Sequence, residues 1–228
     1  MSSETKLHAQ ALQTPVVARE EGLPPGEYSP PRRDAVLTSR LYSTGTSTAA
    51  HGLPGFLHTE RLMLREPRSP DAGEVFEDCT RDPQVMRYLP WRPHASVADT
   101  EQFIAGCVRD WTSGLKLPYV VTLRDTPDRA IGMLEARPRS HLIEIGYMLG
   151  RPYWGQGLMS EALKAWADAA LGNPSIFRIQ ATCDVDNLGS ARVLAKAGFL
   201  REGRLERCTV YSNINSEPRP CFLYALTR

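Results

Sequence analysis

Hydrophobic and polar positions begin to follow regular periods near Phe56. Alternation between Leu57 and Arg65 predicts a first strand, in which Leu62 and Leu64 share one face. Two short helices are then indicated by start signals that combine a capping residue with proline at the first helical position. These signals are Ser69-Pro70-Asp71 and Asp82-Pro83, and the second helix is expected to run through Tyr88.

A longer amphipathic helix is predicted between Ser96 and Gly114. Its apolar residues recur at helical spacing, and Ser96 with Asp99 resembles a capping box at its start. Glycine often follows the last turn of a helix, which places the end at Gly114. Two β-rich segments, Tyr119–Leu123 and Ile131–Ala136, flank turn-forming residues and predict a hairpin.

The next strand is predicted from His141 to Leu149, with two distinct faces. One face holds Ile143, Ile145, Tyr147 and Leu149, and the other holds Leu142, Glu144, Gly146 and Met148. A turn with two glycines follows, and then an amphipathic helix from Leu158 to Leu171. The polar face of this helix is expected to be solvated and to form ion pairs along the helix through Glu161, Lys164 and Asp168.

The last elements are strands and one more helix. A strand is predicted at Phe177–Cys183, a helix at Leu188–Ala197 with Asn187 as its cap, and final strands at Thr209–Tyr211 and Cys221–Leu226. A polar loop over residues 212–220 separates the final strands. This order of elements predicts an α/β fold, with a sheet of mixed strand direction and helices on its faces.

Residues 1–54 have a different composition from the rest. They are rich in proline, serine, threonine and glycine and hold few large apolar residues, which predicts a disordered N-terminal extension before a folded domain at residues 55–228. Arginines among serines are also typical of a transit peptide, but the acidic residues of this segment argue against one. These acids are Glu20, Glu21, Glu27 and Asp34.

Composition narrows the class of protein. The 228 residues are 42% hydrophobic and 23% charged, with a formal net charge of +1, so nucleic acid is not expected as the main partner. No apolar run approaches the roughly 18 residues of a membrane span, so no membrane partner is expected either. The five cysteines are scattered and never in CxxC spacing, which argues against a disulfide framework or a metal site and favours the cytoplasm.

The turn after Leu149 is the strongest candidate for chemistry. A strand that feeds a glycine turn and then a helix directs several backbone N–H groups, and the positive end of the helix dipole, at one point, which favours phosphate binding. The turn is neither a Walker A motif nor a Rossmann fingerprint, since Ser160 occupies the place of the third glycine of GxGxxG. A plain tight turn is the alternative.

Several stretches in the right order resemble the GNAT superfamily of acyl-CoA-dependent N-acetyltransferases. They are Glu144–Tyr147, Tyr153–Leu163, Asn187–Phe199 and Glu202-Gly203, and Thr59–Arg65 adds a resemblance to the branch that acetylates the N-termini of ribosomal proteins. The resemblance covers residues 56–226. It implies a central mixed, mostly antiparallel sheet with helices on both faces and one splayed pair of strands.

The resemblance also implies how acetyl-CoA is held as co-substrate, without a metal. In the turn pattern of the superfamily, Trp154 stands at the Arg/Gln position and Gly157 and Met159 at the two small positions, where the methionine is expected to narrow the cradle slightly. The N–H groups of Gly155, Gln156, Gly157, Leu158, Met159 and Ser160 would hold the pyrophosphate. Tyr147, Met148 and Leu149 would splay from the neighbouring strand after Ile179 and pair with the pantetheine, with Met148 or Leu149 donating to the thioester oxygen.

Two catalytic residues are predicted. Glu144 is the candidate base for the acceptor amine, and the alternative is a strand-face carboxylate paired with an arginine. Leu194 stands where many members carry a tyrosine that protonates the thiolate, so Ser190, with Asn187, is expected to bond the thiolate or the pantetheine. Tyr211 is a further candidate acid. Tyr88 and Trp91 are expected either to wall the substrate cleft or to pack in the core.

The resemblance implies an N-acetyltransferase that acts on a primary amine by direct attack, most simply a protein or peptide N-terminus. A small amine such as an antibiotic, polyamine or amino-acid derivative is the alternative acceptor. A fold that binds acyl-CoA without turnover is the alternative from another class. The chain is expected to be a monomer or a homodimer. The amine is set by the loops at Tyr88–His94 and Ser212–Pro220, because loops carry specificity on a shared scaffold.

Overall fold

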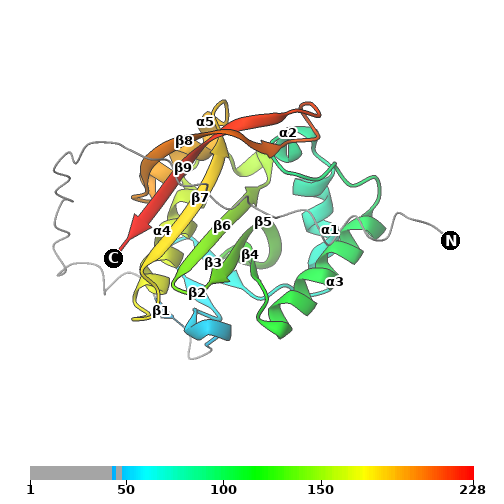
Figure 1. The fold of residues 1–228 in the computed structure, drawn as a ribbon. Coiled ribbons are helices and arrows are strands. Elements are labelled where there is room, and N and C mark those ends of the chain that lie inside the picture. Colours follow the sequence, from blue (N-terminus) through cyan, green and yellow to red (C-terminus); the bar gives the residue numbers. More distant parts are fainter. Residues whose placement is uncertain (1–42, 45–47) are drawn as a thin grey trace.

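The structure is a computed structural model that describes Ser43–Thr44 and residues 48–228. The described residues form one nine-stranded sheet in the order β1-β2-β3-β4-β5-β6-β7-β9-β8 (Figure 1). Its strands are β1 (Ser43–Thr44), β2 (Leu57–His58), β3 (Leu62–Arg65), β4 (Leu117–Leu123), β5 (Thr126–Arg139), β6 (Leu142–Leu149), β7 (Arg178–Asp184), β8 (Leu200–Val210) and β9 (Pro218–Thr227).

Strand direction is mixed but mostly antiparallel, as predicted. Among the strand pairs of the described residues, β6 and β7 alone run parallel, and they pair at three positions only. The last of these pairs joins Glu144 to Gln180. Beyond it the two strands separate, one residue later than the position predicted at Ile179. Strand β7 instead pairs with β9 along its whole length.

Helices cover both faces of the sheet. The helical segments are η1 (Ala50–Gly52), α1 (Asp71–Val75), the π-helical η2 (Phe76–Thr80), α2 (Pro83–Met86), α3 (Val97–Ser113), η3 (Arg151–Tyr153), α4 (Leu158–Leu171) and α5 (Leu188–Lys196). Helices α4 and α5 contribute to one core cluster, whereas α1, η2 and much of α3 pack in a second cluster on the other face. This two-sided arrangement confirms the predicted fold class.

Alternation along each inner strand divides the core between the two faces. On β6, Ile143 and Ile145 pack with the buried Trp166 of α4, and Met148 packs with Met133 on the opposite face. The faces of this strand are therefore those predicted from its sequence. Tyr119 of β4 lies against Trp166, with ring centroids 6.0 Å apart.

Some element boundaries differ from prediction. Helix α1 begins at Asp71, not after a Ser69 cap, because the Asp71 carboxylate forms a buried ion pair with Arg65 (2.6 Å) and accepts the N–H of Arg68. Helix α2 ends at Met86, short of the predicted Tyr88. The capping box at the start of α3 is confirmed, since Asp99 accepts the backbone N–H of Ser96 at 2.9 Å.

Strand β8 starts at Leu200, whereas only its last residues were predicted as strand. Its first half is mostly exposed and charged, so it carries no hydrophobic alternation that could have revealed it. A bulge with Arg207 at φ 48° interrupts its pairing with β9. It lies at the edge of the sheet, where charged residues and bulges discourage pairing with other chains.

The predicted N-terminal extension falls largely on residues 1–42 and 45–47, which lie outside the described residues. Residues 48–54 are described, and they pack on the domain. Leu53 is fully buried, Tyr119 donates to Pro54 O at 2.6 Å, and His51 Nε2 lies 2.9 Å from Gly114 O. The folded part of the chain therefore begins before the boundary predicted at residue 55.

No helix in the described part of the chain is both long and apolar enough to span a bilayer.

Candidate active site

A cavity of about 940 Å³ lies where β6 and β7 separate. Both strands line it, together with β5, the turn before α4, the first turns of α5, and α2 with the loop that follows it. Its size suits a cofactor-sized ligand. Every sequence-predicted site residue lines this cavity except Gln156, whose neighbours on both sides do.

The turn before α4 depends on its glycines. Gly155 and Gly157 have φ of 77° and 76°, a left-handed conformation that strains other residues. A side chain at Gly155 would meet no atom within 4 Å, so conformation, not space, requires glycine there. Gly157 is also the N-cap of α4 and makes no side-chain cap.

The N-terminus of α4 keeps its backbone donors available. Within the described residues, no hydrogen bond engages the N–H groups of residues 155–160, and the first intrahelical bond runs from Glu161 N to Gly157 O. Uncapped N–H groups at the positive end of a 14-residue helix favour an anion. The turn therefore fits the diphosphate of a nucleotide co-substrate.

Side chains on three segments brace this turn. Trp154 donates from Nε1 to Leu149 O at 2.7 Å, and Gln156 donates to Pro152 O at 2.9 Å. Arg61 bonds Gln156 O at 3.1 Å and pairs with Glu161 at 2.6 Å. Glu161 was predicted on a solvated helix face; it instead joins the β2–β3 connection to the start of α4. The predicted Lys164–Asp168 pair is present at 2.6 Å.

Met159 lines the cavity and also packs against the core. Its side chain is only 3% exposed and packs in the core cluster beneath α4, as does that of Leu158. A bulky residue is tolerated here because the helix turns this position inward. Ser160 lines the cavity beside them.

Tyr147 and Ser190 meet across the gap between β6 and α5. Their hydroxyl oxygens lie 2.8 Å apart, and Tyr147 Oη also lies 3.2 Å from Ser190 O. Asn187 Oδ1 accepts the Ser190 N–H at 3.1 Å and so caps α5, as predicted. Burial raises the pKa of the Tyr147 hydroxyl above its usual value. Leu194, at the expected tyrosine position, is fully buried in the core.

Glu144 occupies the closed end of the gap, at the last pair between β6 and β7. It lines the cavity, and its carboxylate lies 4.0 Å from Arg139 Nε. The arginine-paired alternative for this residue thus has a physical basis. Arg137 is directly opposite it on β5.

Sequence reasoning missed a second charged pair on the same face. Glu135 and Arg137 of β5 line the cavity, with Glu135 Oε1 3.4 Å from Arg137 Nη1. Burial is the main cause that raises the pKa of Glu135, and Arg137 and Lys116 act in the opposite direction. The available signal was the alternation of charge within an inner strand, Glu135-Ala136-Arg137.

Of the two loops predicted to set specificity, Tyr88–His94 lines the cavity through its aromatic residues, whereas no residue of Ser212–Pro220 lines it; Tyr211, just before that second loop, does. Tyr88 and Tyr211 line it and meet edge to face, with centroids 6.2 Å apart, and Trp91 also lines it. The Asn213 amide joins the loops by donating to Met86 O, Leu89 O and Trp91 O at 2.6, 3.2 and 2.7 Å. Burial raises the pKa of Tyr211, which weakens it as an acid.

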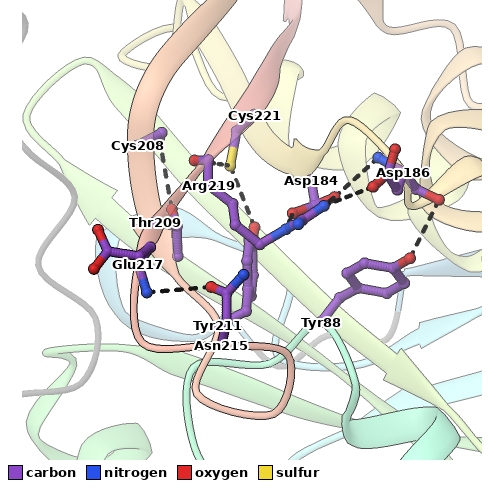
Figure 2. A network of polar contacts seen from close by, with 10 residues as sticks. All are labelled: Tyr88, Asp184, Asp186, Cys208, Thr209, Tyr211, Asn215, Glu217, Arg219 and Cys221. Carbon is purple, nitrogen blue, oxygen red and sulfur yellow. Dashed lines mark hydrogen bonds and ion pairs between the residues drawn. The ribbon is translucent and has the colours of Figure 1, made fainter.

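Arg219 of β9 fixes the corner between β7 and α5 (Figure 2). It bonds both carboxylate oxygens of Asp184, at 2.6 and 3.1 Å, and Asp186 Oδ2 at 2.6 Å. Tyr88 reaches the same corner by donating to Asp186 O at 3.3 Å. This network places Asn187, and hence Ser190, relative to the cavity.

The described residues contain no group of three or more His, Cys, Asp or Glu side chains arranged to hold a metal ion.

Comparison with known proteins gives consistent matches. The family model of the acetyltransferase (GNAT) domain matches residues 61–200. The chain is 33% identical over 157 residues to the uncharacterized N-acetyltransferase YnaD of Bacillus subtilis, covering 68% of this chain and 88% of that protein. It is 27% identical over 142 residues to the ribosomal-protein-serine acetyltransferase of Escherichia coli, covering 60% and 79%.

Solved structures share the fold. Mycobacterium smegmatis RimJ in complex with CoA-disulfide superposes with a TM-score of 0.63 and 24% identity, covering 73% of this chain and 81% of that one.

Proposed function

Since the chain belongs to the GNAT acetyltransferase family, we propose that it transfers the acetyl group of acetyl-CoA to the N-terminal amine of a protein or peptide. One observation carries this proposal. The cavity at the β6–β7 gap is lined both by an uncapped helix N-terminus and by aromatic loop residues. A cavity lined in this way could hold the co-substrate and the acceptor together between the separated strands β6 and β7.

Residues on the turn side would hold the co-substrate. The N–H groups of residues 155–160 would bind the diphosphate, and the unpaired edge of Tyr147–Leu149 would bond the amide-containing arm. Acetyl-CoA supplies an activated acetyl group as a thioester. A backbone N–H of β6 would polarise the thioester oxygen, and the Tyr147–Ser190 hydroxyl pair would donate to the sulfur that leaves.

The acceptor amine would attack directly, without a covalent enzyme intermediate. Two cysteines line the cavity, but burial raises the pKa of Cys107 to about 12 and of Cys183 to about 11. Thiols with such pKa values hold little thiolate near pH 7, so they are poor nucleophiles. This supports a ternary complex.

Two observations support a peptide N-terminus as acceptor. A relative with 27% identity is named as a ribosomal-protein-serine acetyltransferase. In addition, the aromatic wall formed by Tyr88, Trp91 and Tyr211 is built from loops, which can admit an extended chain end. A small amine and non-catalytic acyl-CoA binding are the competing functions.

Thiol release tests all three functions. The chain is mixed with acetyl-CoA and either peptides that begin with serine or alanine, or small amines such as spermidine, free amino acids and an aminoglycoside. We expect release with peptides at a kcat/KM at least tenfold above that with small amines. If a small amine were preferred, the acceptor would be a small amine and not a peptide. If the chain bound CoA but released no thiol with any amine, only the non-catalytic binding function would remain.

We also propose that the chain works in the cytoplasm, as a monomer or homodimer. All five cysteines are free thiols in the structure, which suits a reducing compartment.

A further inference from the structure

Glu135 faces the open part of the β6–β7 gap across a position that has no side chain. Its cross-strand neighbour on β6 is Gly146, which directly precedes Tyr147. Because side chains alternate along β5, Glu135, Arg137 and Met133 project from the face that also carries Met148. Gly146 therefore leaves room for Glu135 to reach the cavity beside the expected thioester position.

Arg137 covers the same glycine. A side-chain carbon added at Gly146 would lie 3.4 Å from Arg137 Nη2. The guanidinium also lies 3.4 Å from Glu135 Oε1, while its buried Nε has no hydrogen-bond partner among the residues that the structure describes. Arg137 thus contacts Oε1 of Glu135 while its guanidinium lies over Gly146.

We propose that Glu135 is the carboxylate that binds the acceptor ammonium and removes its proton, with Arg137 as its positioning residue. The proposal deepens the proposed function and rests on it. Glu144 fits less well, because it lies where β6 and β7 are still paired and is already engaged by Arg139. Glu135 lies instead where the strands have separated.

The surroundings of Glu135 increase the basicity of its carboxylate. The groups that face it are Arg137 on its own strand, Asp110 and Cys107 of α3, Lys116 at the start of β4, and Glu144 on β6. Burial outweighs the two cations and raises the pKa of Glu135. A carboxylate with a raised pKa is a stronger base, and its ionised form attracts an ammonium.

The proton balance is simple. The ammonium gives one proton to Glu135, which becomes a neutral acid, and the nitrogen lone pair is then free to form the new N–C bond. The C–S bond breaks with its electron pair on sulfur, and the thiolate takes up a proton as the amide nitrogen loses one. Glu135 then releases its proton to solvent, so each turnover yields one amide, one thiol and one proton.

The test compares Glu135→Gln with Glu144→Gln, using thiol release with acetyl-CoA and a serine peptide from pH 5.5 to 9.5. For Glu135→Gln we expect kcat/KM for the peptide to fall by about 10²- to 10⁴-fold at pH 7. The loss in kcat/KM should be smaller at high pH, where less of the amine is protonated and less of it needs a base. KM for acetyl-CoA should change less than twofold. Glu144→Gln should lose less than tenfold.

Two further variants complete the design. Arg137→Met removes a nearby positive charge, so the acid limb of the pH–rate profile should move to higher pH, which a purely structural role would not cause. Glu206→Gln, on the exposed edge strand, is the matched control and should match wild type. Calorimetric CoA binding and thermal unfolding verify folding of each variant.

The outcomes separate the two proposals. Wild-type chain without turnover on any amine overturns the proposed function and this assignment together. Turnover that survives Glu135→Gln within threefold, or a larger loss in Glu144→Gln, overturns only the assignment of Glu135.

Discussion

Arg219 shows how much can depend on one side chain. It satisfies Asp184, whose side chain is fully buried, and also reaches Asp186 on the way into α5. A buried carboxylate left without its cation costs far more free energy than an exposed pair contributes. Arg219 therefore stabilises the fold and sets the corner that carries Asn187 and Ser190.

Arg219→Met should destabilise the protein by about 3–5 kcal/mol, because it leaves the Asp184 charge buried and unpaired. Urea unfolding at pH 7 measures the change. Arg204→Ala, which breaks an exposed pair with Glu206, is the control and should cost less than about 1 kcal/mol. Equal costs for the two variants would show that Asp184 finds another partner.

Glu135 predicts a pH dependence of stability with a definite sign. Its pKa is raised in the folded protein, so its favourable contribution is complete below the unfolded pKa and is lost as pH rises through the folded pKa. The stability of wild type relative to Glu135→Gln should therefore fall as pH rises above about 4.3, the ordinary value for Glu. Urea unfolding of both proteins from pH 4 to 8 measures this difference, and a rising difference would contradict the assignment.

Single residues were the least predictable part of the site. The glycine turn before α4 and the Asn187 cap of α5 lie where predicted, because they follow from local backbone requirements. Glu135 was not singled out, because its proposed role depends on the pairing of β5 with Gly146, which no local pattern encodes. Burial of the Met159 side chain under α4 was not predicted either, because it is a tertiary outcome.

At the scale of elements, the β6–α4 turn joins a strand edge to a helix N-terminus. Its two glycines are left-handed, and the N–H groups of residues 155–160 make no hydrogen bond within the described residues. Arg61 and Glu161 then tie the turn to the β2–β3 connection. The cradle is therefore preformed, and a ligand need not order it.

Gly157→Ala should destabilise the protein by about 1–2 kcal/mol, because alanine is strained at φ 76°. Relief of that strain would shift the N–H groups and raise KM for acetyl-CoA several-fold. Thiol-release kinetics and thermal unfolding give both values. Gly73→Ala in α1 is the control. The added Cβ would meet no atom of the described residues within 4 Å, so stability should be unchanged or slightly higher. An unchanged KM for acetyl-CoA would show that the diphosphate does not bind at this turn.

Elements with a buried face were predictable and the others were not. Strand β6 and helices α3, α4 and α5 carry clear periods because one side of each meets the core. The first half of β8 is solvated and η2 is a π-helical turn, so neither leaves a periodic trace. The end of α2 at Met86 and the start of α1 at Asp71 depend on contacts with other parts of the fold, which local sequence does not show.

At the scale of the whole molecule, residues 48–54 belong to the folded domain. Leu53 is 0% exposed in the main core cluster, and Asn173 after α4 donates to His51 O at 2.8 Å. The segment thus joins β4, α3 and the end of α4. Composition could not reveal this, because one buried leucine among polar residues gives no period.

Leu53→Ala should cost about 2–5 kcal/mol, the usual range for a leucine removed from a packed core. Leu200→Ala is the control, since Leu200 is 51% exposed and should change stability by less than about 0.5 kcal/mol. Chemical denaturation measures both. A small cost for Leu53→Ala would mean that the segment detaches readily from the domain.

The separation of β6 from β7 also has a consequence for amide hydrogen exchange. Successive residues of an antiparallel strand point their N–H groups to opposite edges, and from Ile145 to Leu149 only the β5 edge is paired with another described strand. Exchange in the free protein should therefore be fast and slow at alternate residues of this strand. A co-substrate lying along the open edge would slow the fast-exchanging amides and so erase the alternation. The exchange pattern over the five amides from Ile145 to Leu149 would therefore report whether the site is occupied, before any acceptor is known.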